Sequence, residues 1–205
     1  GYNYSGESLL EGADLVEDCV IRYCPGSIFK YATSPVNRCL VHENENSYYR
    51  VWGTQGKITN NLVMNNIGTA DPAVVASSIS DLYKIRDNIV LNNGYSFGVA
   101  NPIWGIFHLP PNYFGTVDSL RIESLIQDFH EDSYYPVILG DSALSVPPST
   151  AHGFNWKVEV NGVDPQDEDL DYLGPDTHQF DVYFNRAMDT EYTPFLTFGV
   201  DQPYT

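Results

Sequence analysis

The chain has 205 residues with 27 acidic and 10 basic side chains, so its formal net charge at pH 7 is −17. Binding to a nucleic-acid backbone needs clustered lysine and arginine, and this charge therefore argues against nucleic-acid partners. No run of apolar residues in the sequence is long enough to cross a bilayer, so we expect no membrane insertion. The acidic balance is typical of a soluble secreted or surface protein, and we expect an extracellular or cell-surface location.

Five short segments share one pattern, in which a small or polar residue is followed by two aliphatic residues. They are Cys19-Val20-Ile21, Cys39-Leu40-Val41, Asn61-Leu62-Val63, Asn88-Ile89-Val90 and Ser124-Leu125-Ile126. A charged or amide residue precedes each segment, and four of the five also carry Val or Ile three residues before the small position. The intervals between copies grow from 20 to 36 residues, which is too long for hairpins. The pattern therefore predicts parallel strands, one circuit of chain apart, in a solenoid with insertions in its loops.

Stacked circuits would place equivalent residues in ladders about 4.8 Å apart along the solenoid. The first predicted ladder consists of Cys19, Cys39, Asn61, Asn88 and Ser124, and the second of Cys24, Asn44, Asn66, Asn93 and Phe129. Asparagine suits the corners of such circuits because it tolerates left-handed backbone and its amide can bond to neighbouring circuits. Three cysteines cannot all pair within one chain, so we expect small buried thiols, with a Cys19–Cys39 bond as the alternative.

The two aliphatic residues of each segment should point to opposite faces of their strand. We expect the second residue to fill the interior and the first to face outward. The outward residues are Val20, Leu40, Leu62, Ile89 and Leu125. A bare stripe of this size would be unusual on a soluble protein, and we expect insertions of the chain itself to cover it.

The segments Thr59 to Asn66 and Arg86 to Gly94 resemble the coil repeat of the right-handed parallel β-helix family, best known from pectate-lyase-like proteins. The resemblance covers roughly residues 10 to 145 and is specific for fold rather than for activity. It implies an all-β fold with at least five coils, which we assign to residues 1–147. A β-sandwich whose strands are similar by coincidence is the alternative.

The character of the sequence changes at Pro147-Pro148-Ser149-Thr150, which we interpret as a domain boundary. Residues 155–160, 178–184 and 194–200 then predict β-strands. The segment Phe184 to Asp189 resembles bacterial Ig-like modules with an F-x-x-P-M-D motif, although Ala187 stands at the usual proline. A complete Ig-type sandwich takes about 100 residues. We therefore expect residues 148–205 to be an incomplete Ig-like β-sandwich, and the chain to be a fragment whose partner is the remainder of a larger bacterial polypeptide.

Aromatic residues are concentrated in the spacers between the repeats, where exposed rings can stack on sugar faces. The candidate carbohydrate-binding residues are Tyr48, Tyr49, Trp52, Trp104, His108 and Tyr113. The alternative is that these rings pack the insertions onto the core, because aromatic side chains are large and usually mostly buried.

Acid–base chemistry on a glycan needs two carboxylates facing one bond, or a base together with a cation. The candidate catalytic residues are His42, Glu43, Arg50, Asp128 and His130, and a solvated outer face is the favoured alternative explanation for them. Their spacing is not that of a compact catalytic motif. We therefore favour a non-enzymatic module that presents or binds carbohydrate, with a polysaccharide lyase or glycoside hydrolase as the alternative.

The densest acidic run lies between residues 164 and 171. Its candidate Ca²⁺ ligands are Asp164, Asp167, Asp169 and Asp171. Ca²⁺ prefers six to eight oxygen ligands, which carboxylates at alternate positions can supply. The run lacks the glycine and the distal glutamate of an EF-hand loop, so only a looser Ca²⁺ site is predicted. An acidic surface loop without metal is the alternative.

Overall fold

The structure, a computed structural model, describes residues 14–24, 35–44, 49–51, 56–66, 72–76, 78–99, 104–165 and 169–191. These residues form an all-β fold with two short helices, α1 (Ile79–Leu82) and α2 (Ser119–Glu123). Neither helix in this part of the chain is long and apolar enough to cross a membrane.

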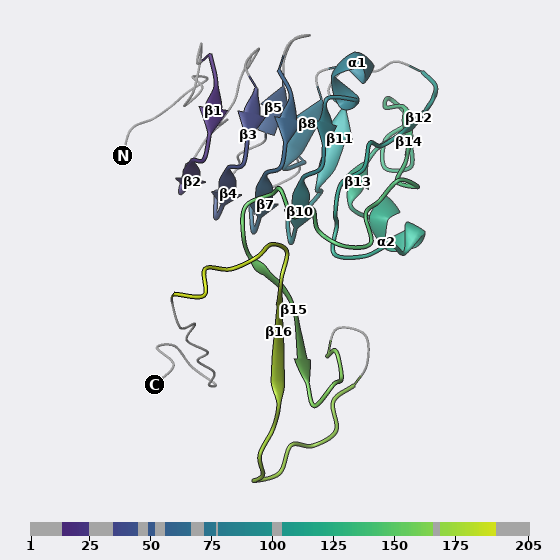
Figure 1. Cartoon of the computed structure of the whole chain (residues 1–205). Coiled ribbons are helices and arrows are strands. Elements are labelled where there is room, and N and C mark those ends of the chain that lie inside the picture. The colour runs from purple at the N-terminus through teal and green to yellow at the C-terminus, as the bar shows by residue number, and fades with distance from the viewer. Residues whose placement is uncertain are drawn as a thin grey trace.

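Three parallel sheets carry most of the strands, and the chain visits them in turn (Figure 1). The first sheet contains β1 (Val16–Glu17), β3 (Val36–Asn37), β6 (Ile58–Thr59) and β9 (Ile85–Arg86). The second contains β2 (Val20–Arg22), β4 (Leu40–His42), β7 (Leu62–Met64) and β10 (Ile89–Leu91). The third contains β5 (Tyr49–Val51), β8 (Val74–Ala76), β11 (Phe97–Val99) and β13 (Ile126–Gln127). Successive strands of each sheet come from successive circuits, an arrangement compatible with a parallel β-helix.

Two smaller sheets complete the described part of the chain. Strands β12 (Ile106–His108) and β14 (Val137–Leu139) pair in parallel next to the third sheet. Strands β15 (Asn155–Val160) and β16 (Phe180–Phe184) form an antiparallel pair, which we call the hairpin and which projects from the stacked circuits (Figure 1). The predicted strand at residues 194–200 lies outside the described residues. The domain boundary at residue 147 stays a prediction.

The register of the first four repeats is the predicted one. In the second sheet Val20 pairs with Leu40, which pairs with Leu62 and so on to Ile89, all in parallel. The first sheet is aligned in the same way, from Val16 through Val36, Ile58 and Ile85. The aliphatic residues that lie three positions before the small residue of each repeat therefore form a separate sheet, the first one.

The fifth predicted repeat was assigned to the wrong sheet. Ile126 pairs with Phe97 of β11 in the third sheet. The position after Asn88 in the first ladder belongs to Asn112, and the neighbouring Tyr113 bridges Ile89. The physical reason is that the long insertion contains an additional pass along the second sheet. Ser124 itself caps the C-terminus of α2.

The second ladder was also predicted one member too long. Cys24, Asn44, Asn66 and Asn93 are linked from circuit to circuit by backbone N–H to side-chain Oδ1 hydrogen bonds of 2.9 to 3.2 Å. Phe129 follows β13 of the third sheet, and its N–H donates to the carbonyl of Pro136. It therefore does not continue that ladder.

Left-handed backbone marks the two corners that flank the second sheet. Residues with φ between 49° and 60° occupy equivalent places in each circuit: Asp18, Arg38, Asn60 and Asp87 at one corner, and Tyr23, Glu43, Asn65 and Asn92 at the other. Each of them directly precedes a ladder residue. A left-handed residue other than glycine costs roughly 1–2 kcal/mol. The charged or amide residue that precedes each of the first four repeats is thus the corner residue, whereas Glu123 before the fifth lies in α2.

Buried asparagine amides satisfy the backbone at these corners. Asn88 is 1% exposed, and its Oδ1 accepts from both the backbone N–H and the Nδ2 of Asn61 at 3.0 Å. Its Nδ2 donates to the carbonyls of Ile58 and Arg86 at 2.9 and 3.0 Å, and to Asn112 Oδ1 at 3.0 Å. One side chain thus ties together three circuits.

Replacing Asn88 by alanine should lower the free energy of unfolding by about 3 kcal/mol, because several buried polar partners lose their hydrogen bonds together. Urea unfolding monitored by circular dichroism measures the change. Asn155→Ala, at an exposed position on β15, should shift the same free energy by less than about 0.5 kcal/mol. Equal effects of the two substitutions would contradict the role assigned to the ladder.

The interior of the circuits is filled by the predicted second aliphatic column. Ile21, Val41, Val63 and Val90 are all buried. Cys39 is completely buried beside them, and burial raises the pKa of its thiol to about 11. All three cysteines are free thiols; Cys39 is buried, as predicted, whereas Cys19 and Cys24 are only partly buried.

The outward column is covered by the chain from the third circuit onward. Leu62 and Ile89 are at most 2% exposed, whereas Val20 in the first circuit is 59% exposed. The cover is a second apolar cluster that contains Tyr113 and Ala151, with Leu144, Phe154 and Trp156 packed against it. The chain itself supplies the cover, as predicted, but most of it comes from residues 144–156 rather than from the spacers.

The segment after residue 147 is also tied down by polar contacts. The side chain of Asn185 donates to the carbonyls of Pro148 and His152 and accepts from the N–H of Phe154. Burial lowers the pKa of His152, nearby Arg186 and His42 lower it further, and Asp18 opposes them. The folded chain therefore favours the neutral imidazole.

Because the folded pKa of His152 lies below its unfolded value, this residue stabilises the fold fully above pH 6.5 and loses its contribution as the pH falls further. The melting temperature of the native chain should fall between pH 7.5 and pH 5.5, and His152→Gln should show a smaller fall. Thermal melts at both pH values measure the difference. Equal falls for the two proteins would contradict this assignment.

Candidate functional site

A groove separates the insertion that covers the second sheet from the first residues of the hairpin. It consists of two adjoining cavities of about 480 and 460 Å³, both lined by Tyr113, Gly115, Arg121 and Trp156. The first cavity is further lined by Thr116, Val117, Ser145, Lys157 and Asp164, and the second by Met64, Leu91, Asn92, Phe114, Phe154 and Asn155. The groove therefore has an apolar end against the circuits and a polar end against β15.

Two aromatic rings form the shared part of the groove. The backbone of Tyr113 is fixed to the second sheet, because its N–H donates to the carbonyl of Asn88 and its carbonyl accepts from Val90, both at 2.8 Å. The Tyr113 ring meets Trp156 edge to face, with centroids 6.3 Å apart. Trp156 also meets Tyr183 of β16 at 6.3 Å. These contacts hold the half-buried indole at the junction.

Gly115 is required where the chain bends over Leu91 at the edge of the groove. Its φ is +78°, in the left-handed region, and a Cβ there would lie 3.0 Å from Leu91 Cδ2. A larger residue would strain the backbone and push the insertion away from the circuits.

The cations of the groove differ in their pairing. Lys157 pairs with Glu159, and its Nζ lies 3.8 Å from Asp164 Oδ2. The hydrogen bond with Glu159 raises the pKa of Lys157 and lowers that of Glu159. In contrast, no carboxylate in the described part of the chain pairs with the guanidinium of Arg121. The Arg121 side chain is exposed and lines both cavities.

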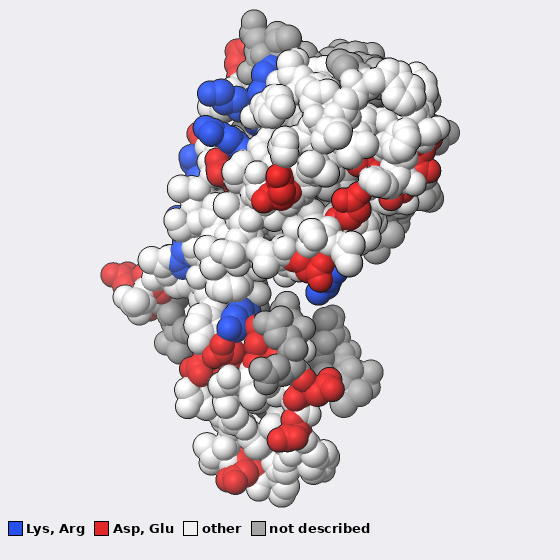
Figure 2. Space-filling model, turned by 90° about the vertical axis from the view of Figure 1, so that its right-hand side faces the viewer, with Lys and Arg blue, Asp and Glu red and all other residues white. Residues whose placement is uncertain are grey.

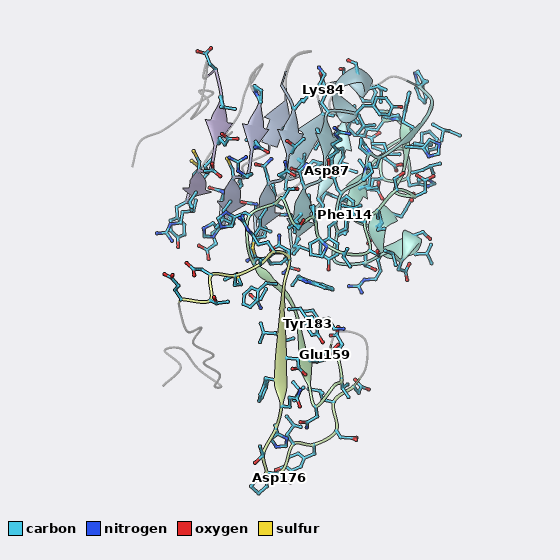
Figure 3. All side chains as sticks on the ribbon, in the orientation of Figure 1. Lys84, Asp87, Phe114, Glu159, Asp176 and Tyr183 are labelled. Atoms are coloured by element: carbon cyan, nitrogen blue, oxygen red, sulfur yellow. The ribbon has the colours of Figure 1, made fainter. Side chains whose placement is uncertain are left out.

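The hairpin presents a fixed polar surface below the groove. The hydroxyl of Tyr183 donates to Glu159 Oε2 at 2.9 Å, which raises the tyrosine pKa, and Lys157 Nζ lies 5.2 Å from the Tyr183 ring centroid. Figure 3 shows Tyr183 and Glu159 together on the hairpin, with Phe114 above them at the edge of the circuits. On the face drawn in Figure 2, basic side chains lie mainly along one edge of the upper part and also where the two parts meet, whereas acidic side chains are spread over both parts.

Of the predicted carbohydrate-binding residues, the structure brings Tyr113 to the groove. Trp104 is 72% exposed, and His108 on β12 pairs with Asp141 at 2.8 Å; neither lines the groove. Tyr48, Trp52 and the side chain of Tyr49 lie outside the described residues. Sequence reasoning missed Trp156, whose position in an alternating strand predicted only a sheet.

The predicted catalytic residues fall into two separate groups. His42 and Glu43 lie at the end of β4 in the second sheet, with His42 Nδ1 3.4 Å from Glu43 Oε2. Asp128 and His130 lie in the loop after β13 of the third sheet. The side chain of Arg50 lies outside the described residues. Neither group lines the groove.

The predicted Ca²⁺ ligands are only partly described. Asp164 lies beside Lys157, Asp169 and Asp171 are exposed, and Asp167 is outside the described residues. The Ca²⁺ site therefore stays a prediction.

A Ca²⁺ site at residues 164–171 would raise the melting temperature by about 5 to 10 °C when free Ca²⁺ reaches a hundred times its dissociation constant. Thermal melts in EDTA and in millimolar Ca²⁺ measure the shift. The double substitution Asp169→Asn and Asp171→Asn should remove it. Identical melts of the native chain in both buffers would exclude the site.

Comparisons of the chain with protein-family models, with curated proteins and with solved structures found no match.

Proposed function

We propose that this chain is a carbohydrate-binding module of a secreted or cell-surface protein, built on a right-handed parallel β-helix with an Ig-like segment behind it. The parallel sheets and the buried asparagine ladders support the β-helix. The antiparallel pair of β15 and β16 supports the Ig-like segment.

The observation that carries the proposal is the aromatic groove. The faces of pyranose rings are apolar and pack on aromatic side chains. The half-buried Trp156 supplies such a ring at the junction of the two cavities, and Tyr113, which is 6% exposed, supports it from behind. The volumes of the cavities lie within the usual range of ligand pockets, about 300 to 1,000 Å³. Arg121, Ser145 and Thr116 add polar groups for sugar hydroxyls.

Binding is favoured over the alternative of a polysaccharide lyase or glycoside hydrolase. Hydrolysis by acid–base catalysis takes two carboxylates on opposite sides of one bond. Asp164 is the sole carboxylate among the described residues that line the groove, and it lies next to Lys157. This arrangement provides neither the pair of carboxylates nor a base free of a neighbouring cation.

A panel of plant, algal and host glycans tests the proposal by direct binding to the intact chain. For the best ligand, Arg121→Ala and Trp156→Ala should each lower the affinity at least about ten-fold, which corresponds to about 1.4 kcal/mol. Trp104→Ala is the matched control, because this exposed tryptophan lies outside the groove, and its affinity should stay within about two-fold of native.

Circular dichroism confirms that the variants are folded. Absence of binding to every glycan, or unchanged binding by both groove variants, would overturn the proposal. Release of shortened or unsaturated oligosaccharides by the native chain would favour the enzymatic alternative.

A further inference from the structure

Three potential metal ligands meet at a place outside the groove. Glu123 is the last residue of α2, Asp128 directly follows β13, and His130 lies two residues further on. One carboxylate oxygen of each acid and one ring nitrogen of His130 all lie within 4.8 Å of one another. His130 Nε2 is 3.2 Å from Glu123 Oε1. The fold thus gathers residues of two elements around one point.

Asp128 is held in place by the loop that it closes. The residue is 1% exposed, its Oδ1 accepts from the N–H of His130 at 2.9 Å, and its Oδ2 accepts from the N–H of Ile138 at 2.7 Å. The N–H of Asp128 in turn donates to Glu131 Oε2 at 2.9 Å. Hydrogen bonds that orient a ligating carboxylate are a regular feature of metal sites.

The helix that carries Glu123 is equally well positioned. Asp118 caps its N-terminus by accepting from the N–H groups of Leu120 and Arg121. Ile122 is 1% exposed and packs against Gly140, where a Cβ would overlap its side chain. The side chain of Glu123 itself remains about one third exposed.

The local charge is strongly negative and lacks a balancing cation. Glu123, Asp128, Glu131 and Asp132 occur within ten residues. In the described part of the chain no lysine or arginine pairs with any of them. A carboxylate removed from water is costly unless hydrogen bonds, an opposite charge or a metal compensate it, and Asp128 has two backbone N–H donors.

We propose that Glu123, Asp128 and His130 bind one divalent transition-metal ion, with Zn²⁺ as the reference ion. Zn²⁺ binds imidazole nitrogen and carboxylate oxygen at about 2.0–2.2 Å, so donor atoms around a tetrahedral ion lie about 3.4 Å apart. Rotation of the exposed His130 and Glu123 side chains toward the fixed Asp128 would shorten the distances between the donor atoms from at most 4.8 Å to about 3.4 Å. Three protein ligands leave one position for water or a ligand group. The imidazole favours this class of ion over Ca²⁺ and Mg²⁺.

Calorimetric titration of the intact, chelator-treated chain with Zn²⁺ tests the site, and Co²⁺ gives a second readout through its visible absorption. One ion should bind per chain. His130→Ala and Glu123→Gln should each lower the affinity at least about ten-fold and abolish the Co²⁺ spectrum. His108→Ala is the matched control, because His108 also pairs with a carboxylate, Asp141 at 2.8 Å, but belongs to no described three-ligand group. Its affinity should remain native.

Both test positions are at least one third exposed, so the variants should stay folded, which circular dichroism verifies. Absence of Zn²⁺ binding to the native chain, or native affinity in His130→Ala, would overturn the proposal. An equal loss in His108→Ala would overturn it as well. These outcomes are independent of glycan binding, because none of the three ligands lines the groove.

Discussion

The buried asparagine amides hold successive circuits in one register, and the rest of the structure depends on this constraint. At each corner of the second sheet the chain adopts left-handed backbone, and the N–H of the ladder residue has an asparagine Oδ1 of the next circuit as its acceptor where its neighbours have backbone carbonyls. Asn61 and Asn88 at one corner and Asn66 and Asn93 at the other thereby make side-chain contacts to the circuits on either side. Because the side-chain period of a strand is two, a slip by one residue would exchange the interior and outer columns. The amides would then lose their carbonyl partners inside the protein. Both the exposure of the interior column and the loss of these hydrogen bonds therefore oppose the slip.

Fixing the register creates an outer apolar column that the chain must cover. Strands of parallel sheets are usually apolar on both faces, because something packs on each face. Here the cover consists of Tyr113 and residues 144–156. The groove is the space left where these two covering segments meet at Trp156, so the site and the burial of the second sheet have the same structural origin.

Electrostatics gives the region around α2 its character. With a net charge of −17, the chain pairs half of its described lysine and arginine side chains with acids, as Arg38 pairs with Glu17 and Asp18. Arg121 is exposed at the groove, and two residues later Glu123 begins a group of carboxylates. One short helix thus contributes a cation to the proposed glycan site and an anion to the proposed metal site.

The sequence by itself determined the parallel strands and their register over four repeats. The reason is that a small or polar residue such as Asn61 or Asn88 recurs one circuit apart, directly before each aliphatic pair, and so marks the same position in each circuit. The prediction from sequence failed at Asn112 and Tyr113. These residues follow two prolines and continue the second sheet, but they lack the aliphatic pair that marks the other repeats. The segment Ser124-Leu125-Ile126, which follows the short helix α2, has the residue pattern of a repeat, which is why the sequence predicts a fifth one there. The groove was decided only by tertiary structure. Trp156 and Arg121 carry no motif, and their meeting depends on how residues 144–156 pack on Leu62 and Ile89, a contact between segments far apart in the chain. The same holds for Glu123 beside His130: the sequence shows a charged loop, and only the closure of that loop by Asp128 brings the side chains together.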